Sequence, residues 1–276
     1  MHSGDIDSAM QLSTAEGWNQ TRDDWKFFIE NSVNICVVAE INKKIIGTTT
    51  AINYSGEVAW ISMVLVNKAY RGMGVSKLLL QNILEKTKHC KSIKLDATFA
   101  GQQVYKNMGF IDEYTIARLT CASVQSLPFY DDTLIQSIQL SHIEEIVAFD
   151  QKVFGANRAQ LIQYIIKKHP AKSWMIKRNN LLAGFMLGRD GNKYHHIGPL
   201  MSLQFSDAKL LILKALKQLR HKPAVIDILN DKEDLINWLS SIGFIKQRQF
   251  VRMYKNENSN PGIVENQYLI CGPEFG

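Results

Sequence analysis

The segment from Arg71 to Ser76 contains the residues best suited to binding an anion. It reads Arg71-Gly72-Met73-Gly74-Val75-Ser76 and stands between an apolar run and an amphipathic pattern. In a turn from strand to helix, backbone amides and the positive end of the helix dipole converge and stabilise a negative charge. The glycines permit positive φ and a close approach to a diphosphate, and Arg71 adds a charge-assisted contact. Without further context, a plain strand-to-helix turn explains the same residues.

Two common nucleotide-binding loops are excluded for this segment. A Walker loop requires Gly-Lys-Ser/Thr, which does not follow Gly74. A dinucleotide-binding fingerprint requires a third glycine at the start of the helix, and none is present. The anion expected here is therefore bound in another way.

Apolar periodicity predicts the elements that position this segment. Runs at 35–39 and 45–52 predict the two strands of a hairpin, and 58–66 predicts a third strand. From Val75 to about His89, apolar residues recur every three or four positions, which indicates an amphipathic helix. The anion-binding segment is thus expected between a strand and a helix.

Three shorter elements complete the first half. Residues 92–96 predict a strand, 102–108 a helix that ends before Gly109, and 110–119 a closing strand. The first half is therefore an α/β unit with a mixed sheet.

The second half repeats this order of elements. A helix is predicted at about 207–220, a strand at 224–229, a helix near 235–239 and a strand around 251–253. In place of the glycine segment it has Gln204-Phe205-Ser206-Asp207, without a glycine. The second unit is therefore expected to lack the anion-binding turn.

Matching residues at nearly constant separation support an internal duplication. Asp96 is separated from Asp227 by 131 residues. The separation is 134 residues both between Gly109 and Gly243 and between Arg118 and Arg252. Convergence of two ordinary α/β units is the alternative. Residues 123–133 break both periodicities and contain Pro128, which predicts a connection. We therefore expect two domains, 1–122 and 133–276.

Composition is typical of a globular protein. The chain has 276 residues, 46% of them hydrophobic, and no run approaches the roughly 18 consecutive apolar residues of a membrane helix. The polar start lacks the apolar core of a signal peptide, so we expect a cytoplasmic protein without a membrane partner. The net charge of +6 is diffuse, which argues against nucleic acid as a partner. The oligomeric state is unknown at this point.

No metal site is expected. The four cysteines stand far apart without a C-x-x-C pair, so reduced thiols are favoured over zinc ligands or disulfides. His195 and His196 are adjacent on a predicted strand and point to opposite faces, so both cannot readily bind one ion.

These features together resemble the GNAT acetyltransferase superfamily. The resemblance rests on residues 60–66, 71–76 and 105–110 and covers about 33–119. The middle segment falls on the family's phosphate-loop pattern Q/R-x-x-G-x-G/A, with Ser76 in the last place. The chain is also similar to a two-domain bacterial subgroup with a degenerate C-terminal GNAT-like domain. The implied fold class is α/β (α+β), with two tandem GNAT-like units, each a mixed, mostly antiparallel twisted sheet flanked by helices.

The resemblance implies acetyl-CoA as the co-substrate. It assigns the pantetheine arm to the backbone of a splayed strand and the pyrophosphate to the amides of the glycine segment. The implied cofactor-binding residues are Met63, Val64, Leu65, Val66, Arg71, Gly72, Met73, Gly74, Val75 and Ser76.

The resemblance also implies two roles in proton transfer. Tyr105, four residues before Gly109, matches the family's general acid, and a phenol with a pKa of about 10 can protonate a departing thiolate. Packing on a short helix is the alternative role for Tyr105. An amine must lose a proton before it attacks, and Asp96, near the predicted cleft, or a chain of waters is the candidate base. Capping the turn at 97–98 is the alternative role for Asp96.

By the same resemblance, an early segment borders the acceptor pocket. The candidate acceptor-binding residues are Trp18, Asn19, Asp24, Trp25 and Trp60. The tryptophans would supply flat apolar walls, and the two polar residues would supply hydrogen bonds. The alternative is that all three tryptophans belong to the core.

The expected function is an acyl-CoA-dependent N-acyltransferase that moves an acetyl group from acetyl-CoA to a primary amine, on a small molecule or a protein lysine. Direct transfer is expected because no cysteine lies between Val64 and Cys90. The alternative is a non-catalytic acyl-CoA-binding sensor, in which the second half passes a signal to a partner.

Overall fold

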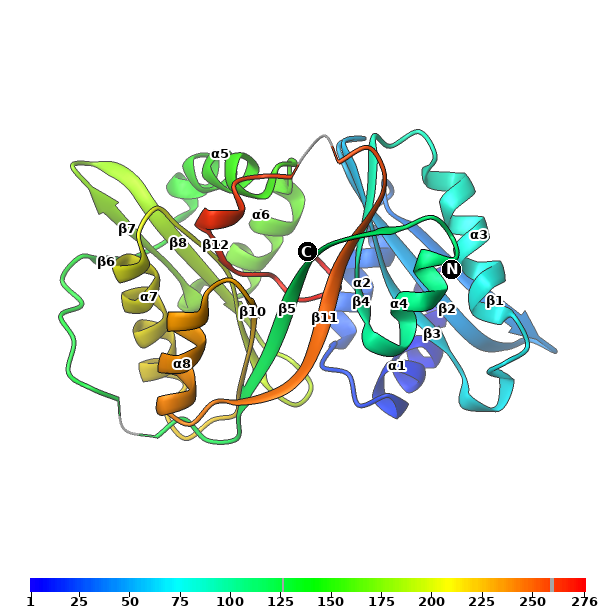
Figure 1. Ribbon diagram of the computed structural model, residues 1–276, viewed down its shortest axis with the longest axis horizontal. Coiled ribbons are helices and arrows are strands. Elements are labelled where there is room, and N and C mark those ends of the chain that lie inside the picture. The colour runs from blue at the N-terminus through cyan, green and yellow to red at the C-terminus, as the bar shows by residue number, and fades with distance from the viewer. Residues whose placement is uncertain (126, 259–260) are drawn as a thin grey trace.

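The computed structural model describes residues 1–125, 127–258 and 261–276. All strands named in this part of the chain belong to one 12-stranded sheet (Figure 1). The strands are β1 (Ile35–Ile41), β2 (Lys44–Tyr54), β3 (Val58–Val66), β4 (Ser92–Thr98), β5 (Ile111–Cys121), β6 (Ile135–Ser137), β7 (Ser173–Arg178), β8 (Leu181–Arg189), β9 (His195–Ser202), β10 (Ala224–Leu229), β11 (Ile245–Asn256) and β12 (Gln267–Leu269). The α-helices are α1 (Ile6–Ala15), α2 (Arg22–Glu30), α3 (Val75–Thr87), α4 (Phe99–Lys106), α5 (Ile143–Phe154), α6 (Ala159–Lys168), α7 (Phe205–Gln218) and α8 (Glu233–Ser241).

The sheet has the strand order β1-β2-β3-β4-β11-β5-β10-β12-β9-β8-β7-β6. Its strand pairs are antiparallel except β3–β4 and β9–β10, which are parallel and occupy equivalent places in the two halves. The predicted fold class, two tandem α/β units with mixed, mostly antiparallel sheets, is confirmed.

The elements predicted for the first half form in the predicted order. β1 and β2 make the expected hairpin, joined by Asn42 and Lys43 at φ 49° and 62°, a conformation that suits a two-residue hairpin turn. β3 has the predicted bounds, and α3 begins at Val75 as predicted. α4 begins at Phe99, three residues earlier than predicted, because Thr98 caps it.

The second half follows the same order. β10 has the predicted bounds, and α7, α8 and β11 overlap the predicted segments with longer or slightly shifted ends. The residues between β5 and β6, apart from the uncharacterised position 126, contain no helix or strand. The expected connection at 123–133 falls within this stretch.

Successive residues of β3 face two different layers, as side chains alternate along a strand. Val58 and Trp60 pack in the cluster that includes residues of α1 and α2. Ala59 and Ile61 pack in the cluster beneath α3, which also covers β1 and β2. The strand that leads toward the glycine segment is therefore covered on both faces and held rigidly.

The first of these layers is shared by both halves of the chain. It contains residues of α1 and α2 together with residues of α5 and α6 and the C-terminal Phe275. The Phe275 ring stacks on Phe28 with centroids 5.1 Å apart, and the Tyr54 hydroxyl donates to the Phe275 carbonyl over 2.7 Å. Among the described residues, no helix has both the length and the apolar character needed to cross a bilayer.

The two halves exchange their closing strands. β11 of the second half lies between β4 and β5, and β5 of the first half pairs with β10 of the second. Figure 1 shows β5 and β11 crossing the middle of the molecule, with the C-terminal end of the chain beside them. The ranges 1–122 and 133–276 therefore remain our proposed units. In the sheet, however, β11 of the second unit pairs with β4 of the first, and β5 of the first pairs with β10 of the second.

Candidate active site

The parallel strands β3 and β4 separate after a short region of pairing. The ladder joins Val58–Trp60 to Ser92–Lys94 and ends there, although both strands continue. At Met63, β3 adopts φ 53° and its register against β2 shifts, so the strand bends away. The edge of β3 that faces β4 beyond Trp60 is left without a strand partner and can accept an extended ligand by main-chain hydrogen bonds.

The glycine segment follows directly from the end of β3. Gly72 and Gly74 both have φ 79°, a left-handed conformation that favours glycine. The nearest helical bond runs from the Leu78 amide to the Gly74 carbonyl, 3.1 Å, so the amides ahead of Leu78 have no helical partner. A Cβ at either glycine would meet no atom within 4 Å, which means that open space adjoins this turn.

A groove, here called the outer groove, is lined in part by this turn. It is lined by Glu16, Trp18, Val64, Leu65, Val66, Tyr70, Arg71, Gly72, Gly74, Val75, Ser76, Thr98, Ala100 and Arg248. Arg71 is fixed at its edge, since it donates to the Val66 carbonyl over 3.2 Å and to Glu16 over 2.6 Å. The predicted cofactor-binding residues thus line this groove or the adjoining pocket, except Met73, whose side chain is exposed.

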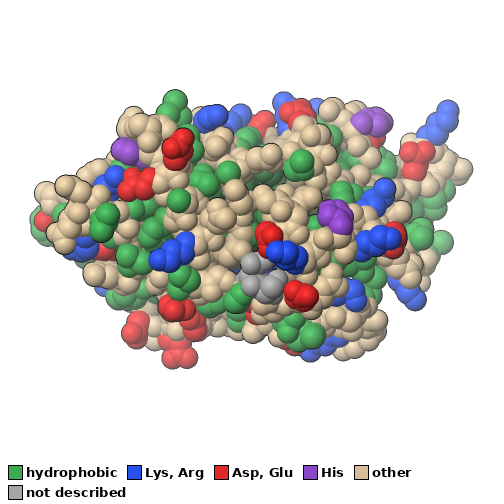
Figure 2. Space-filling model, turned by 90° about the horizontal axis from the view of Figure 1, so that it is seen from above, with side chains coloured by type: hydrophobic (Ala, Val, Ile, Leu, Met, Phe, Trp, Pro, Cys, Tyr) green, Lys and Arg blue, Asp and Glu red, His purple; other side chains and the backbone are tan. Residues whose placement is uncertain are grey.

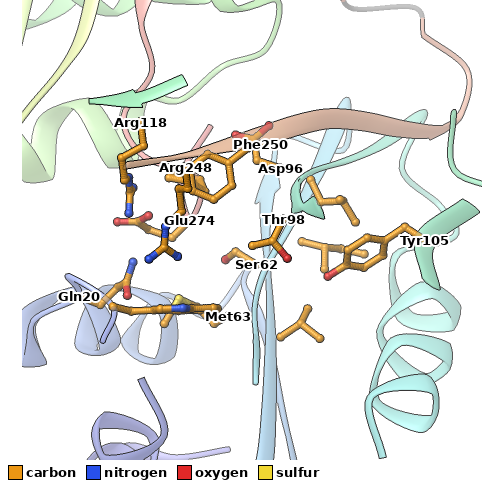
Figure 3. Close-up of a pocket in the computed structure, with 15 residues that line it drawn as sticks. Gln20, Ser62, Met63, Asp96, Thr98, Tyr105, Arg118, Arg248, Phe250 and Glu274 are labelled. Atoms are coloured by element: carbon orange, nitrogen blue, oxygen red, sulfur yellow. The ribbon is translucent and has the colours of Figure 1, made fainter. Parts of the chain in front are cut away.

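A second cavity, here called the inner pocket, adjoins the outer groove (Figure 3). It is lined by Trp18, Gln20, Ile61, Ser62, Met63, Val64, Leu95, Asp96, Thr98, Tyr105, Arg118, Arg248, Phe250, Pro273 and Glu274. Trp18, Val64, Thr98 and Arg248 line both cavities. The turn that can hold an anion therefore opens into a pocket built from both halves of the chain.

Tyr105 projects from α4 into the inner pocket (Figure 3). Its ring packs edge-on against Phe110, with centroids 5.8 Å apart, and this contact fixes its direction. Burial raises the pKa of Tyr105 to about 12, so the phenol keeps its proton at neutral pH. The residue is therefore in the pocket, protonated and available as a donor.

Asp96 borders the same pocket but is already engaged. Arg252 donates to both of its carboxylate oxygens, over 2.9 and 3.0 Å, and also donates to the Tyr114 hydroxyl over 2.6 Å. Burial raises the pKa of Asp96 even though the guanidinium opposes this. Its side chain is 0% exposed. This geometry argues against the expected role of Asp96 as a free base.

Trp18 is the one predicted acceptor residue, among those the structure describes, that lines the inner pocket. Asn19, beside it, joins the two halves instead. Its side chain accepts from the amides of Lys193 and Tyr194, each over 2.9 Å, and donates to the Tyr194 carbonyl over 3.0 Å. The expected contact between Asn19 and an acceptor is therefore corrected to a structural one.

Asp24, Trp25 and Trp60 are likewise corrected to structural roles. Asp24 caps α2 by accepting from Thr21 and also pairs with Arg189. Trp25 and Trp60 are both 0% exposed in the core shared by the two halves. The core alternative stated for these two tryptophans is thus the one that holds.

The second half contributes pocket residues that are not among the predicted site residues. Arg248 and Phe250 come from β11, and Pro273 and Glu274 from the C-terminal segment. Trp60 fixes this segment by donating to the Pro273 carbonyl over 3.0 Å. No local pattern marks these residues, because only the strand exchange brings them to the first half.

The equivalent position in the second half is filled by the chain itself. β9 and β10 pair in parallel at 195–197 and 224–226, like β3 and β4. β12 then lies between them, and its Leu269 pairs with both Ile228 and Leu200. No glycine turn precedes α7, and within the described residues of the second unit β12 closes the gap that stays open between β3 and β4.

Comparisons with known proteins agree with this description. A family model described as "Acetyltransferase (GNAT) family" matches residues 6–110, and one described as "Acetyltransferase (GNAT) domain" matches 146–269. The chain is 26% identical over 250 residues to a holothin acyltransferase of Pseudoalteromonas sp. (strain SANK 73390), covering 90% of this chain and 83% of that protein.

Solved structures share the fold. One is a putative acetyltransferase from Pyrococcus horikoshii, with a TM-score of 0.81 and 21% identity, covering 100% of this chain and 94% of that chain. Another is a tandem GNAT protein from the clavulanic acid biosynthesis pathway, with a TM-score of 0.63 and 11% identity, covering 92% and 96%. The chain therefore belongs to the GNAT family of acetyltransferases and is an acyl-CoA-dependent N-acyltransferase with two GNAT domains in tandem.

Proposed function

We propose that this enzyme transfers an acetyl group from acetyl-CoA directly to a primary amine, and that it does so in the first unit alone. The observation that carries this proposal is the continuity of the glycine turn, the free edge of β3 and the inner pocket. These three features match the diphosphate, the extended amide-bearing arm and the thioester of one elongated donor. A small-molecule amine fits the inner pocket, which residues of both halves line, better than a protein lysine does.

In this proposal, different residues bind different parts of acetyl-CoA. The amides of Gly72–Ser76 hold the diphosphate, and Arg71, which is paired with Glu16, lies at the groove's edge. The backbone of Met63–Val66 bonds to the pantetheine arm. This arrangement directs the thioester into the inner pocket, where Tyr105 lies.

Tyr105 supplies the proton in the transfer step. The neutral amine nitrogen attacks the thioester carbonyl carbon, a C–N bond forms and the C–S bond breaks. The Tyr105 hydroxyl protonates the departing sulfur, the nitrogen gives its proton to a base, and a proton returns from that base through solvent to the tyrosinate. No covalent enzyme intermediate is needed, in keeping with direct transfer.

The proton acceptor for the amine is better sought at Glu274 than at Asp96. Both oxygens of Asp96 accept from Arg252, whereas Glu274 shares the single guanidinium of Arg189 with Asp24. Arg189 contacts Glu274 through Oε1, so among the described residues Glu274 Oε2 has no arginine donor, whereas each oxygen of Asp96 has one. We assign proton removal to Glu274, acting directly or through water.

The test combines binding, turnover and product identification. The purified protein is incubated with acetyl-CoA and a metabolite extract, and acetylated amines are identified by mass spectrometry. Tyr105→Phe is expected to bind CoA as the unchanged protein does and to lose about 100- to 10,000-fold in kcat. Tyr254→Phe, a half-buried tyrosine that lines neither cavity, is the matched control.

Two outcomes would contradict the proposal. Absence of CoA binding by calorimetry would remove the donor. Unchanged turnover in Tyr105→Phe would remove the proposed acid. Binding of CoA without any acetylated product would instead favour the sensor alternative.

A further inference from the structure

Arg248 lies where the inner pocket meets the outer groove, and its guanidinium has no direct partner among the described residues. It lines both cavities and is half-buried. Among the described residues, no hydrogen bond or ion pair engages its guanidinium. A half-buried cation without a partner is costly, so its presence in a ligand pocket points to an anion that arrives with a ligand.

The position of Arg248 on the sheet increases this cost. It stands directly opposite Arg118 in the pairing of β11 with β5, and like charges placed opposite each other are destabilising. Asp227 accepts from Arg118 twice, both over 2.7 Å, so its direct hydrogen bonds go to that arginine, and only its more distant charge acts on Arg248. Burial and the Arg118 charge lower the pKa of Arg248, although an arginine remains protonated at neutral pH. Arg248 is therefore the member of the facing pair that has no carboxylate in direct contact.

Gln20 adds a second unpartnered group to the same pocket. Its side chain is buried, with the residue 5% exposed, and its Oε1 has no hydrogen-bond partner among the described residues. A buried amide oxygen without a donor is normally satisfied by ligand or water. In Figure 3, Gln20, Arg118, Arg248 and Glu274 lie toward one end of the pocket and Tyr105 toward the other.

The geometry points to an acceptor that carries an anionic group, a carboxylate or a phosphate, in addition to its reactive amine, with Arg248 binding that group. This inference rests on the proposed function, because it names the class of amine that the pocket accepts. Gln20 Oε1 accepts a hydrogen bond from the same molecule. The acetylated product keeps the anionic group, so the amine loses its charge while the anion stays bound to Arg248.

Matched amines with and without the anionic group test this directly. Phenylalanine is compared with 2-phenylethylamine and histidine with histamine for a carboxylate, and O-phosphoethanolamine with ethanolamine for a phosphate. Each is assayed with the unchanged enzyme, with Arg248→Gln and with Lys246→Gln. Lys246 is an exposed residue of the same strand that lines neither cavity, so its replacement removes the same charge elsewhere.

The unchanged enzyme is expected to prefer the anionic member of at least one pair. Arg248→Gln is expected to lower kcat/KM for that member by about 10- to 100-fold, the value of one charge-assisted contact. The same variant should change kcat/KM for the uncharged member, and the KM for acetyl-CoA, by no more than about twofold, because neither quantity depends on that contact. Lys246→Gln should leave kcat/KM for both amines and the KM for acetyl-CoA unchanged.

Other outcomes overturn the inference in distinguishable ways. If the unchanged enzyme prefers the uncharged amines, the proposed function stands and the anionic acceptor is wrong. If Arg248→Gln raises the KM for acetyl-CoA and leaves the acceptor preference as it was, Arg248 binds the donor and the inference fails. If no amine is acetylated and CoA does not bind, the proposed function fails and this inference fails with it.

Discussion

Arg252 and Asp96 form a buried, two-pronged ion pair between β11 and β4, with N–O distances of 2.9 and 3.0 Å. Its counterpart joins Arg118 to Asp227 between β5 and β10, with both distances at 2.7 Å. The arginine of each half thus neutralises the aspartate of the other. The residues whose near-constant spacing indicates duplication are therefore the ones that hold the exchanged strands in register.

Breaking the first pair should destabilise the whole molecule. Asp96→Asn leaves the buried Arg252 without a counter-charge, and we expect the free energy of unfolding to fall by about 3–5 kcal/mol in urea denaturation. Glu85→Gln, which removes an exposed partner of Lys88, should cost less than about 1 kcal/mol. Asp96→Leu combined with Arg252→Met should recover much of the loss. Full stability but lost turnover in Asp96→Asn would instead restore Asp96 as the catalytic base.

The glycine at the start of α3 should matter for the donor rather than for folding alone. Gly74 and Gly56 have φ of 79° and 73°, and a Cβ on either meets nothing within 4 Å. Alanine at each position should therefore cost a similar amount of stability, about 1–2 kcal/mol. Only Gly74→Ala puts a methyl group where the diphosphate is expected, so it alone should weaken CoA binding in calorimetry, by about tenfold or more. Equal CoA affinity in the two variants would contradict the phosphate-binding role of the turn.

The pH profile should report the environment of Tyr105. Burial raises its pKa to about 12, so the phenol stays protonated and active as a donor up to that pH, above the ordinary value of about 10. We expect kcat to hold between about pH 9 and 10.5, a range in which the deprotonated share of an ordinary tyrosine rises from about one tenth to about three quarters. A decline with an apparent pKa near 10 that is absent from the residual activity of Tyr105→Phe would contradict this.

Local sequence patterns predicted most elements because their causes are local. Strand alternation marked β3, and apolar residues every three or four positions marked α3. The early helix α2 was missed, although Thr21 and Asp24 have the spacing of a capping box and Trp25 and Phe28 are three residues apart. That signal would have assigned Asp24 to a cap and Trp25 to the core rather than to the acceptor pocket.

The acceptor side of the site was not predictable by the same means. Arg248 and Glu274 reach the pocket only because β11 inserts between β4 and β5 and the C-terminal segment packs under Trp60. Periodicity indicates that a strand has a buried face, but it does not identify the strand's neighbours. The donor side was predictable because its turn is a continuous segment with its own conformational demands at Gly72 and Gly74.

The strand exchange also predicts that the halves do not fold separately. Residues 1–122 alone would leave β4 and β5 without β11 between them and β5 without β10, exposing unpaired strand edges. We expect this fragment to be insoluble or to lack a cooperative unfolding transition, and co-expression with 123–276 to restore both. A soluble 1–122 fragment with a cooperative transition would show that the units are independent.

Finally, one chain should bind one CoA. In the first unit the edge of β3 beyond Trp60 is open, whereas in the second the equivalent gap is closed by β12 through Leu269. Calorimetry should give a stoichiometry of one, and Gly74→Asp, which puts a carboxylate at the anion site, should abolish the binding heat rather than halve it. A stoichiometry of two, or half the heat remaining in Gly74→Asp, would mean that β12 leaves its place to admit a second ligand.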